Sequence, residues 1–311
     1  MIGIVILNYE TWQESVRCIQ SICDSCKKLL FRIYLVDNAS KSDIPDEIKR
    51  YSEKLGDQFV FIRSESNNGY AAGNNLGIKR ALEDNCHIFI IANNDIVFGE
   101  GSIEKMAVCL QEYPEVGIVG PKVLNDRNEV QNSRCSMKTG GREIFQIYTA
   151  AKLLCRKKWK EYFCLNQDVD TPSYVYHVSG CCFAMSERCA RVITPFDEGT
   201  LLYNEEFMIG IRMEKSGFLT RYEPESVVLH HHEATTGKRP GFKYQCICQS
   251  EQYYGSKYLK LQRWQLWLLY HYRKVLYELR SIGNKNMRNY KKTFLKETRK
   301  TYLEAIQRRT G

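Results

Sequence analysis

The stretch His87-Ile-Phe-Ile-Ile-Ala-Asn-Asn-Asp-Ile-Val-Phe98 decides the fold of this chain. Residues 88–91 show no alternation of polar and apolar side chains, which is typical of a strand covered on both faces in a parallel sheet. Asn93, Asn94 and Asp95 follow where this strand should end. In open α/β sheets, ligands bind at the carboxyl ends of strands, and a carboxylate there can hold a hard cation. Taken alone, the three residues are better explained by an Asx turn that ends the strand.

The composition is that of a folded protein without a membrane span. The 311 residues are 43% hydrophobic and 26% charged, which is enough for a substantial core. The sequence lacks ~20 uninterrupted apolar residues, and the apolar start at 1–7 is too short for a signal peptide. Thirteen cysteines, an odd number, do not suggest a disulfide framework, and core packing explains Cys23 and Cys26 better than zinc does. We therefore expect a cytoplasmic protein.

The positive charge is concentrated at the C-terminus. Residues 273–311 contain twelve Lys or Arg and three Asp or Glu, so this segment alone accounts for the net charge of +9. Two helical stretches, at 257–280 and 285–309, are separated by Ser281-Ile282-Gly283-Asn284. Aromatic and basic residues side by side are typical of a helix in a membrane interface, so we favour an anionic membrane as partner over nucleic acid or a merely solvated face. The aromatic residues are Trp264, Trp267, Tyr270, Tyr272 and Tyr277.

Three further strands are predicted before the central stretch, at 3–7, 33–36 and 59–62. A helix capped by Thr11 is expected at 12–30. The connections are long enough for right-handed crossover helices, which bring the strand ends to one edge of a parallel sheet. Polar segments follow these three strands, namely Asn8-Tyr9, Asp37-Asn38-Ala39-Ser40 and the stretch Asn67-Asn-Gly-Tyr-Ala-Ala-Gly-Asn-Asn-Leu-Gly77.

These strand ends favour a nucleotide held by its base and its diphosphate. Tyr9 offers a ring that can stack on a base, Asp37 can accept a pyrimidine N–H, and the loop rich in glycine and asparagine lets a ligand approach the backbone. The turn after Leu7 contains no glycine, so the Gly-x-Gly-x-x-Gly fingerprint of dinucleotide-binding proteins is missing, and so is a P-loop. A dehydrogenase is therefore disfavoured.

The second half of the sequence is less regular. Its acidic pair Glu205-Glu206 follows Asn204, a suitable N-cap, and carboxylates in a first helical turn are favoured by the helix dipole even without a chemical role. Further along, His230-His231-His232 ends a predicted strand. The other expected elements are a polar loop or hairpin at 121–141, a helix at 142–158, a strand or buried turn at 175–185 containing Gly180, a strand at 222–229 and a mobile lid at 235–241.

The chain resembles the glycosyltransferase family 2 enzymes, which have the GT-A fold, and within them the rhamnosyltransferase-like branch. The resemblance covers about residues 1–270 and rests on seven features in the family's order and spacing. They are Ile6-Leu7-Asn8-Tyr9, Val36-Asp37-Asn38-Ala39-Ser40, the stretch 67–77, Ala92-Asn93-Asn94-Asp95, Gly180 with Phe196-Asp197-Glu198, Tyr203-Asn204-Glu205-Glu206, and His230.

The resemblance implies a mostly parallel, Rossmann-like α/β sheet flanked by helices. The GT-A domain would cover 1–243, with a nucleotide-sugar-binding half at about 1–120 and an acceptor-binding half at 121–243. A basic, aromatic helical extension would follow at 244–311. The donor would be a UDP- or dTDP-linked sugar, bound by Asn8, Tyr9, Asp37, Asn67, Gly73, Asn74, Asn94 and Asp95.

The resemblance also implies a metal and a base. Asp95 and His230 would hold Mn²⁺ or Mg²⁺, for which carboxylate and imidazole ligands are suitable. Adjacent helical residues point ~100° apart, so only one of the two glutamates can face the acceptor, and we assign the base to Glu206. The family usually has Asp at this position and a further Asp where this chain has Met208.

Together these features predict an inverting, metal-dependent glycosyltransferase. It would move a sugar to a hydroxyl of a growing, lipid-linked cell-surface polysaccharide at the inner face of the membrane. The rhamnosyltransferase-like branch implies rhamnose as the sugar. A nucleotidyltransferase and a sugar-nucleotide-binding module without turnover are the alternatives. The tail would meet the membrane, or else be packed against the catalytic domain or buried in a homodimer.

Overall fold

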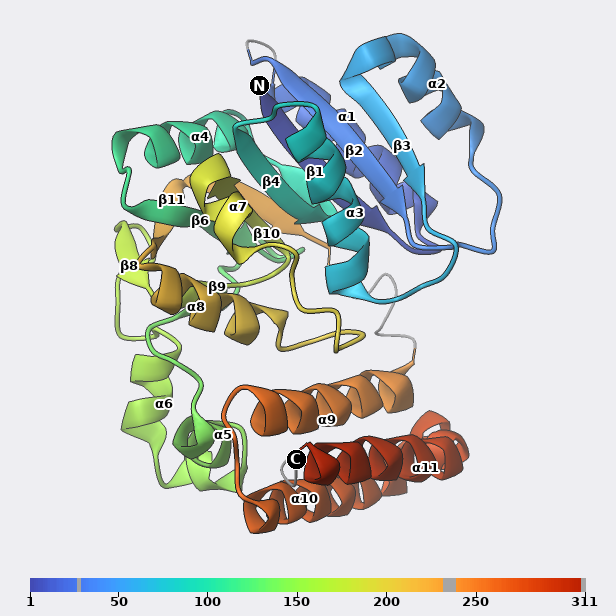
Figure 1. Ribbon diagram of the computed structural model, residues 1–311, viewed down its shortest axis with the longest axis vertical. Coiled ribbons are helices and arrows are strands. Elements are labelled where there is room, and N and C mark those ends of the chain that lie inside the picture. The colour runs from blue at the N-terminus through green and yellow to red at the C-terminus, as the bar shows by residue number, and fades with distance from the viewer. Residues whose placement is uncertain (27–28, 232–238, 309–311) are drawn as a thin grey trace.

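The computed structural model describes residues 1–26, 29–231 and 239–308. A nine-stranded sheet with helices on both faces forms the larger part, and three long helices form the C-terminal part (Figure 1). The strand order is β3-β2-β1-β4-β10-β6-β11-β5, with β8 paired to β11. The predicted α/β architecture with a C-terminal helical extension is confirmed.

The first four strands are parallel and lie where the sequence predicts them. They are β1 (Ile2–Asn8), β2 (Phe31–Asp37), β3 (Phe59–Arg63) and β4 (Ile88–Asn93). Asn8 is the register partner of Asp37, and Leu7 is the partner of Asn93, so the polar strand ends meet at one edge as predicted. The connecting helices are α1 (Trp12–Ser25), α2 (Asp46–Leu55) with the short 3-10 turn η1 (Gly56–Gln58), and α3 (Tyr70–Glu83).

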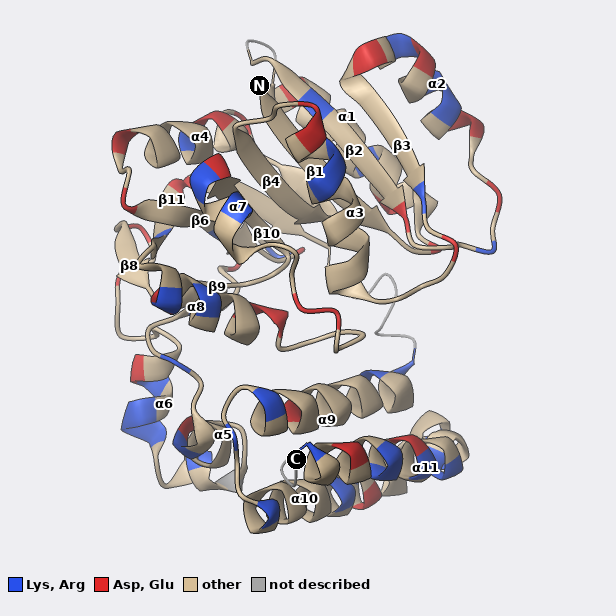
Figure 2. Ribbon diagram, viewed as in Figure 1, with Lys and Arg blue, Asp and Glu red and all other residues tan. Residues whose placement is uncertain are grey.

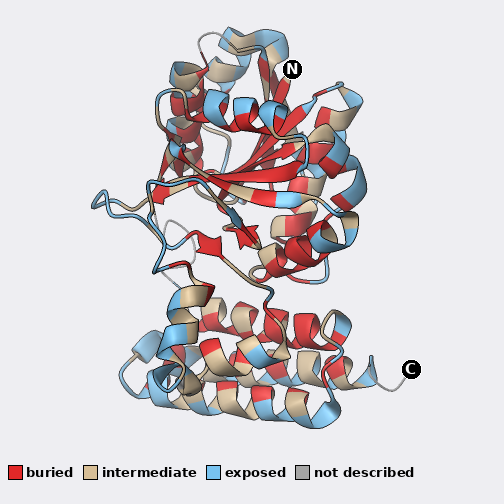
Figure 3. Cartoon of the chain, turned by 90° about the vertical axis from the view of Figure 1, so that its left-hand side faces the viewer, coloured by how far each residue is buried: buried red, intermediate tan, exposed pale blue. Residues whose placement is uncertain are grey.

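The sheet has a hydrophobic core on each face. Helices α1 and α2 cover one face together with α4 (Ser102–Glu112), while α3 covers the other with α7 (Glu187–Ile193) and α8 (Glu205–Ser216). Successive residues of a strand point to opposite faces, so Ile4 and Ile6 of β1 enter the first core and Val5 enters the second. Figure 3 shows the buried strands between exposed outer helix faces. Cys26 is buried in the first core and Cys23 packs against it, as predicted.

The second half of the sheet is mixed. It contains β5 (Ile96–Phe98), β6 (Val116–Leu124), β8 (Ser173–Val175), β10 (Cys182–Ser186) and β11 (Leu219–His230). Strand β10 is antiparallel to both β4 and β6, and β11 is parallel to β6. A separate pair is formed by β7 (Arg134–Cys135) and β9 (His177–Val178). The segment expected as one strand or turn at 175–185 therefore contributes to three short strands.

The prediction of a single helix at 142–158 is wrong. The segment forms α5 (Gly141–Ile147), the 3-10 turn η2 (Ala150–Leu153) and α6 (Arg156–Tyr162). The interruption occurs at Thr149, whose backbone is extended and whose hydroxyl accepts the N–H of Ala151. A threonine side chain that bonds the nearby backbone competes with helix formation in this way.

The C-terminal part consists of α9 (Pro240–Lys257), α10 (Arg263–Ile282) and α11 (Lys285–Gln307). Helix α9 was not identified from the sequence. It lies between the part that contains the sheet and the other two helices (Figure 1) and is apolar on both sides. Tyr253 and Tyr254 pack against Phe207 of α8, whereas Tyr244 and Cys248 pack against α10 and α11.

Helices α10 and α11 are bound to α9 by buried contacts. Arg273 of α10 forms an ion pair with Glu251 of α9, and both side chains are less than 10% exposed. Tyr277 stacks on Phe294 with ring centroids 3.7 Å apart, and Tyr270 stacks on Tyr302 at 4.7 Å. Tyr277 therefore belongs to the core of the extension, and the partly buried Tyr270 to the contact between α10 and α11, while Trp264 and Trp267 remain exposed. Within the described ranges, no helix is long and apolar enough to cross a bilayer.

Candidate active site

Three predicted donor-site residues, Asn8, Asp37 and Asn94, form one hydrogen-bond network at the carboxyl ends of β1, β2 and β4. The Asn8 amide nitrogen donates to Asp37 Oδ1 at 3.0 Å, and the Asn94 amide nitrogen donates to Asn8 Oδ1 at 3.1 Å. Asn94 also donates to the hydroxyls of Thr11 and Ser15, so Thr11 supports the network instead of capping α1 with its side chain. All three predicted residues are buried, and these polar groups bond to one another.

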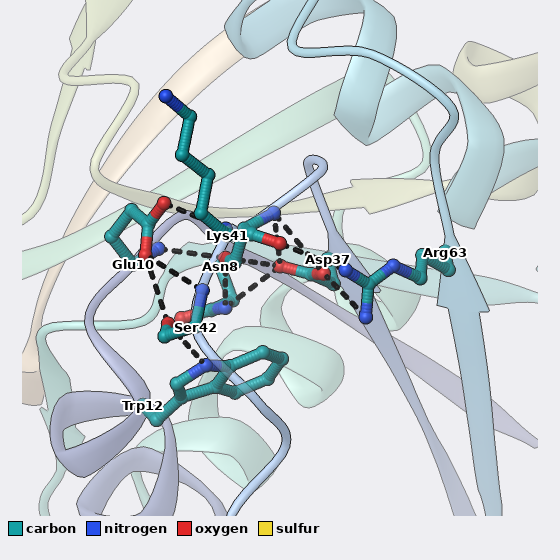
Figure 4. A network of polar contacts seen from close by, with 8 residues as sticks. Asn8, Glu10, Trp12, Asp37, Lys41, Ser42 and Arg63 are labelled. Carbon is teal, nitrogen blue, oxygen red and sulfur yellow. Dashed lines mark hydrogen bonds and ion pairs between the residues drawn. The ribbon is translucent and has the colours of Figure 1, made fainter.

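Asp37 holds the loop that follows β2 (Figure 4). Its carboxylate accepts the N–H of Ser40 at 3.3 Å and also accepts the Ser40 hydroxyl. Arg63 of β3 lies 3.8 Å from Asp37 Oδ2 and donates to the carbonyl of Ser40 at 2.8 Å. The Arg63 side chain is about half exposed, whereas Asp37 has no exposed surface. A contact between Asp37 and a base therefore stays a prediction, and Arg63 is a charged group at this edge that the sequence analysis did not identify.

Glu10 joins the loop after β1 to the loop after β2. Its carboxylate accepts the N–H of Lys41 at 2.7 Å and the Ser42 hydroxyl at 2.8 Å, and these bonds lower its pKa. The Ser42 hydroxyl also accepts the indole N–H of Trp12 (Figure 4). The contact fixes both loops beside the partly exposed Tyr9, the residue predicted to stack on a base. A carboxylate directly after the Asn8-Tyr9 strand end was the available sequence signal for Glu10.

The loop before α3 is tied to the β2 end by Asn67. Its side-chain oxygen accepts from the amide of Asn38 at 2.9 Å and from the N–H of Gly69 at 3.1 Å. Gly69 has φ +98°, and a Cβ there would lie 2.4 Å from the carbonyl oxygen of Leu201. Only glycine fits at this position, and the exposed Asn67 is placed at the rim of the strand ends.

Gly73 and Asn74 face the protein interior. A Cβ on Gly73 would lie 2.3 Å from Leu7 Cδ1, so the glycine allows α3 to pack closely on β1. Asn74 is fully buried, and its amide donates to the carbonyl of Tyr70 at 3.0 Å, while its own oxygen has no hydrogen-bond partner among the described residues. Their contacts with a nucleotide stay predictions.

Asp95 and His230 are brought together by the pairing of β5 with β11. His230 is the register partner of Ile96, and the N–H of His231 donates to the Asp95 carbonyl at 2.9 Å. His230 Nε2 lies 3.3 Å from Asp95 Oδ1, which is the distance of an ion pair but not the geometry of a hydrogen bond. Gln131 lies 3.2 Å from His230 Nδ1, on the other side of the ring.

The donor set of Asp95 and His230 fits a divalent cation. Burial lowers the pKa of His230, but Asp95 and Cys181 raise it to about 10 overall, which shows that the place favours positive charge. Asp95 Oδ1 is buried without a hydrogen-bond partner among the described residues, as a metal-binding oxygen would be. The described ranges contain no group of three or more acidic, His or Cys side chains with metal-site geometry. Remaining ligands of a cation would therefore come from a bound substrate. The predicted lid at 235–241 lies mostly outside the described residues.

Glu205 and Glu206 begin α8 and point to different surroundings. Asn204 occupies the N-cap position with φ 68°, but its side chain makes no capping bond. Glu205 is buried and accepts from the Thr200 hydroxyl at 3.4 Å; burial, with a contribution from Glu206, raises its pKa to about 8. Glu206 is partly exposed and lines a small cavity with Gly180, and burial raises its pKa as well. Of the two carboxylates, only Glu206 lines this cavity.

The cavity beside Glu206 adjoins the end of β4. The Gly180 carbonyl accepts the hydroxyl of Tyr70, and the next carbonyl, of Cys181, accepts the N–H of Asn93 at 2.8 Å. Gly180 thus connects the cavity to the strand end that carries Asp95.

His177 was missed by the sequence analysis. It is 6% exposed, lines the cavity that Glu206 lines, and neither ring nitrogen has a hydrogen-bond partner among the described residues. Burial lowers its pKa to about 4, so the ring is neutral near pH 7. A neutral imidazole can donate from one nitrogen and accept at the other. The only sequence signal for a place of His177 at the site was its position shortly before Gly180, in the stretch His177-Val178-Ser179-Gly180.

Asp197, which is part of a motif, and Arg212 of α8 have structural roles. Asp197 accepts the hydroxyl of Tyr253 and the ammonium of Lys257 at 2.7 and 2.8 Å; burial raises its pKa, but these donors and Tyr258 lower it to about 2. It thereby fastens α9 to the loop before α8. Arg212, which lies one turn after Met208 in α8, donates to the carbonyl of Ile193 at 2.7 Å.

Comparisons with known proteins identify the family to which the chain is similar. The family described as "Glycosyl transferase family 2" matches residues 3–192. An N-acetylglucosaminyl-diphospho-decaprenol L-rhamnosyltransferase of Mycobacterium tuberculosis (strain H37Rv) is 27% identical over 154 residues, which are 49% of each chain. The low-salt glycan biosynthesis hexosyltransferase Agl10 of Haloferax volcanii is 24% identical over 206 residues, 66% of this chain and 59% of the relative. The chain thus spans about half of these relatives' length.

Two solved structures share the fold. The structure of GalNAc-T7 with UDP, GalNAc and Mn²⁺ has a TM-score of 0.57 and 13% identity, covering 83% of this chain and 51% of that one. The mannosyltransferase PcManGT of Pyrobaculum calidifontis in complex with GDP-Man and Mn²⁺ has a TM-score of 0.53 and 14% identity, covering 98% and 85%. The expected GT-A fold is confirmed.

Proposed function

Because this chain belongs to glycosyl transferase family 2, we propose that it is an inverting, metal-dependent glycosyltransferase that uses a nucleotide-diphosphate sugar. The observation that carries the proposal is the position of Glu206. Its carboxylate lines a cavity with Gly180, and the carbonyl after Gly180 bonds the strand end that leads to Asp95. A base on one side and a cation-binding carboxylate on the other are the two groups that such a transfer requires.

Glu206 would act as the general base. It would accept the proton of the acceptor hydroxyl while that oxygen attacks the anomeric carbon, on the face opposite the leaving nucleoside diphosphate. One bond forms as the other breaks, so the configuration inverts. Burial raises the pKa of Glu206 and makes the carboxylate a better proton acceptor than an exposed one. The neutral His177 in the same cavity offers a further hydrogen-bonding group for the acceptor.

Asp95 and His230 would hold the divalent cation, Mn²⁺ or Mg²⁺. Such an ion neutralises charge that develops on a leaving diphosphate. This assignment is supported by the 3.3 Å between His230 Nε2 and Asp95 Oδ1, and by the burial of that oxygen without a hydrogen-bond partner in the described part of the chain. The structures of GalNAc-T7 and PcManGT, which share this fold, were determined with Mn²⁺.

The donor would be held at the ends of β1 to β3. Tyr9, Asn67 and Arg63 present polar or aromatic surface there, and the buried network of Asn8, Asp37 and Asn94 would keep the loops in place. The solved structures hold UDP in one case and GDP-mannose in the other, so this fold accommodates both bases. A UDP- or dTDP-linked donor follows from the resemblance alone.

Rhamnose as the sugar and a lipid-linked glycan as the acceptor are supported by one relative. The mycobacterial enzyme is a rhamnosyltransferase acting on a sugar-diphospho-decaprenol by its name, and the archaeal relative is a hexosyltransferase of glycan biosynthesis. We therefore assign the reaction to the growth of a polysaccharide at the cytoplasmic face of the cell membrane.

A thermal-shift screen of UDP-, dTDP- and GDP-sugars with and without Mn²⁺ tests the donor. A ligand at a hundred times its dissociation constant adds ~2.7 kcal/mol to the stability of the native state. The donor that stabilises the protein is then incubated with glycan acceptors. Release of nucleoside diphosphate supports transfer, release of pyrophosphate would establish a nucleotidyltransferase, and binding without any release across the acceptor panel would indicate a sugar-nucleotide-binding module.

A further inference from the structure

The outer face of α10 carries an exposed apolar stripe. Its members are between 43% and 72% exposed although all are large and hydrophobic. Successive helical residues turn by ~100°, so the six positions fall within a sector of ~120° that runs from Trp264 to Ile282. His271 and Glu278, the ion-pair partner of Lys291, lie in the same sector. A stripe of this length measures ~30 Å at 1.5 Å per residue. The residues of this outer stripe are Trp264, Trp267, Leu268, Val275, Leu279 and Ile282.

The outer stripe is not needed for the core of the extension. The opposite face of α10 supplies the buried contacts to α9 and α11, through Leu266, Leu269, Arg273 and Tyr277. Helix α10 therefore has two apolar faces, of which one is covered by this chain. An exposed apolar surface of this extent marks an interaction site.

Helix α11 presents a basic stripe beside it. Six exposed cations occupy one ~120° sector of the helix, while Met287, Phe294 and Ala305 point into the bundle. The stacking of Tyr270 on Tyr302 shows that α10 and α11 lie side by side, and Figure 2 shows the basic residues along α11. The residues of the basic stripe are Lys285, Arg288, Lys292, Lys296, Arg299 and Lys300.

We propose that the outer stripe of α10 and the basic stripe of α11 together form a docking surface for an anionic lipid bilayer. A helix whose apolar side carries tryptophan, next to lysine and arginine, lies in the interface plane of a membrane. Each basic residue near an anionic surface adds ~1 kcal/mol of attraction. The surface lies at the end of the molecule away from the N-terminal strands (Figure 1), so a bilayer there leaves the nucleotide-binding edge of β1 to β4 open.

Charge distinguishes this partner from a second copy of the chain. A symmetric dimer across the outer stripe would bring two identical basic stripes toward each other. Like charges would then repel, whereas anionic headgroups complement them. The buried ion pair of Glu251 and Arg273 holds α10 on α9, so the surface is preformed. This proposal does not depend on the sugar donor or on Glu206.

Sedimentation of the full-length protein with vesicles tests the proposal. The protein should bind vesicles of phosphatidylglycerol and phosphatidylcholine, and bind pure phosphatidylcholine much less. The double variant Trp264→Ser with Trp267→Ser, and the double variant Lys292→Glu with Lys296→Glu, should each weaken the binding roughly tenfold or more. Because all four side chains are exposed, the melting temperature should stay unchanged.

Matched controls lie on the catalytic half. Val108→Ser with Val192→Ser removes exposed apolar residues from α4 and α7, and Lys54→Glu with Lys79→Glu makes the same charge change on α2 and α3. Both controls should bind vesicles like the unmodified protein. Equal loss in controls and test variants, or no preference for anionic vesicles, would overturn the proposal. Light scattering gives a further test. The proposal would also be overturned if the unmodified protein were a dimer, the tryptophan variant were a monomer, and neither of them bound vesicles.

Sugar transfer to a water-soluble acceptor is measured separately. The tryptophan and lysine variants should retain it, because their residues lie outside the active site. Loss of transfer in the Glu206→Gln variant with vesicle binding intact would show that the two functions are independent.

Discussion

His230 Nε2, at the end of β11, lies 3.3 Å from Asp95 Oδ1, just beyond the end of β4. We predict that Asp95→Asn and His230→Gln each abolish the additional thermal stabilisation that Mn²⁺ gives in the presence of the donor. Both residues lie at strand ends, so the protein should remain folded in each variant. The measurement is the melting temperature with donor, at increasing Mn²⁺ concentration.

His87→Gln is the control for this experiment. His87 is exposed and contacts Glu187 at 2.7 Å, away from the β4 end, so its replacement should leave the response to Mn²⁺ unchanged. If EDTA has no effect on donor binding or transfer by the unmodified protein, the metal assignment is incorrect.

A second prediction concerns the catalytic base. Glu206→Gln retains the size of the side chain but cannot accept a proton, so turnover should fall by roughly 10²- to 10⁴-fold, the usual contribution of a general base. Donor affinity should be unchanged. Glu205→Gln, one residue away, should have a much smaller effect, because Glu205 is turned to Thr200 and is not part of the cavity lining. The opposite ranking of the two variants would move the base to Glu205.

Glu205 also predicts a pH dependence of stability. Its pKa is raised from 4.5 to about 8 by burial and by Glu206, so the native state keeps a proton that the unfolded chain releases. Stability that is fully present below pH 4.5 is therefore lost as pH rises toward 8, by up to ~1.4 kcal/mol for each pH unit. Glu205→Gln should remove this slope, making the variant more stable than the parent at pH 8. Urea unfolding at pH 5 and pH 8 measures the difference; equal slopes would contradict the assignment.

The parallel half of the fold could be predicted because its signals are local. Buried parallel strands are continuously apolar, and polar residues at their ends mark the edge where ligands bind. The pairing of Asp95 with His230, by contrast, was implied by the family resemblance and depends on the antiparallel pair of β5 and β11. Helix α9 could not be predicted, because other helices cover it on both sides and its sequence lacks a one-sided apolar pattern. The split of 142–158 into two helices depended on one threonine, which a pattern over many residues does not reveal.

The individual roles of site residues were harder to predict than their location. Asn8 and Asp37 lie at the predicted edge, but their side chains bond to each other. Gly73 lies in the predicted loop-helix segment, yet it is required by the packing of Leu7. Sequence places a residue on an element, whereas the direction of its side chain depends on neighbours that are distant in the chain. For the same reason Glu10, whose partners are 31 and 32 residues away, was not identified.

His177 predicts a pH dependence of the opposite sign. Burial lowers its pKa from 6.5 to about 4, so the unfolded chain binds a proton that the native state does not. Stability that is full above pH 6.5 should fall as pH drops toward 4, and the loss at pH 5 should be at most ~2 kcal/mol. His177→Phe should lose less stability than the parent between pH 7.5 and pH 5 in urea unfolding. If the difference in unfolding free energy between His177→Phe and the parent were the same at pH 7.5 and pH 5, His177 would become protonated in the native state as it does in the unfolded chain.

The buried pair of Glu251 and Arg273 predicts a strong and non-additive effect on stability. Arg273 Nε donates to Glu251 Oε2 at 2.7 Å, and neither side chain is more than 9% exposed. Glu251→Gln leaves the guanidinium buried without a counter-ion and should lower the free energy of unfolding by ~3–5 kcal/mol, whereas Glu251→Met combined with Arg273→Met should recover most of it. Glu278→Gln, which breaks the partly exposed pair with Lys291, should cost less than ~1 kcal/mol. Urea unfolding of the four proteins measures these values. Equal, small effects at Glu251 and Glu278 would mean that α10 is not held on α9 by this ion pair, and that the extension can separate from the catalytic half at little cost.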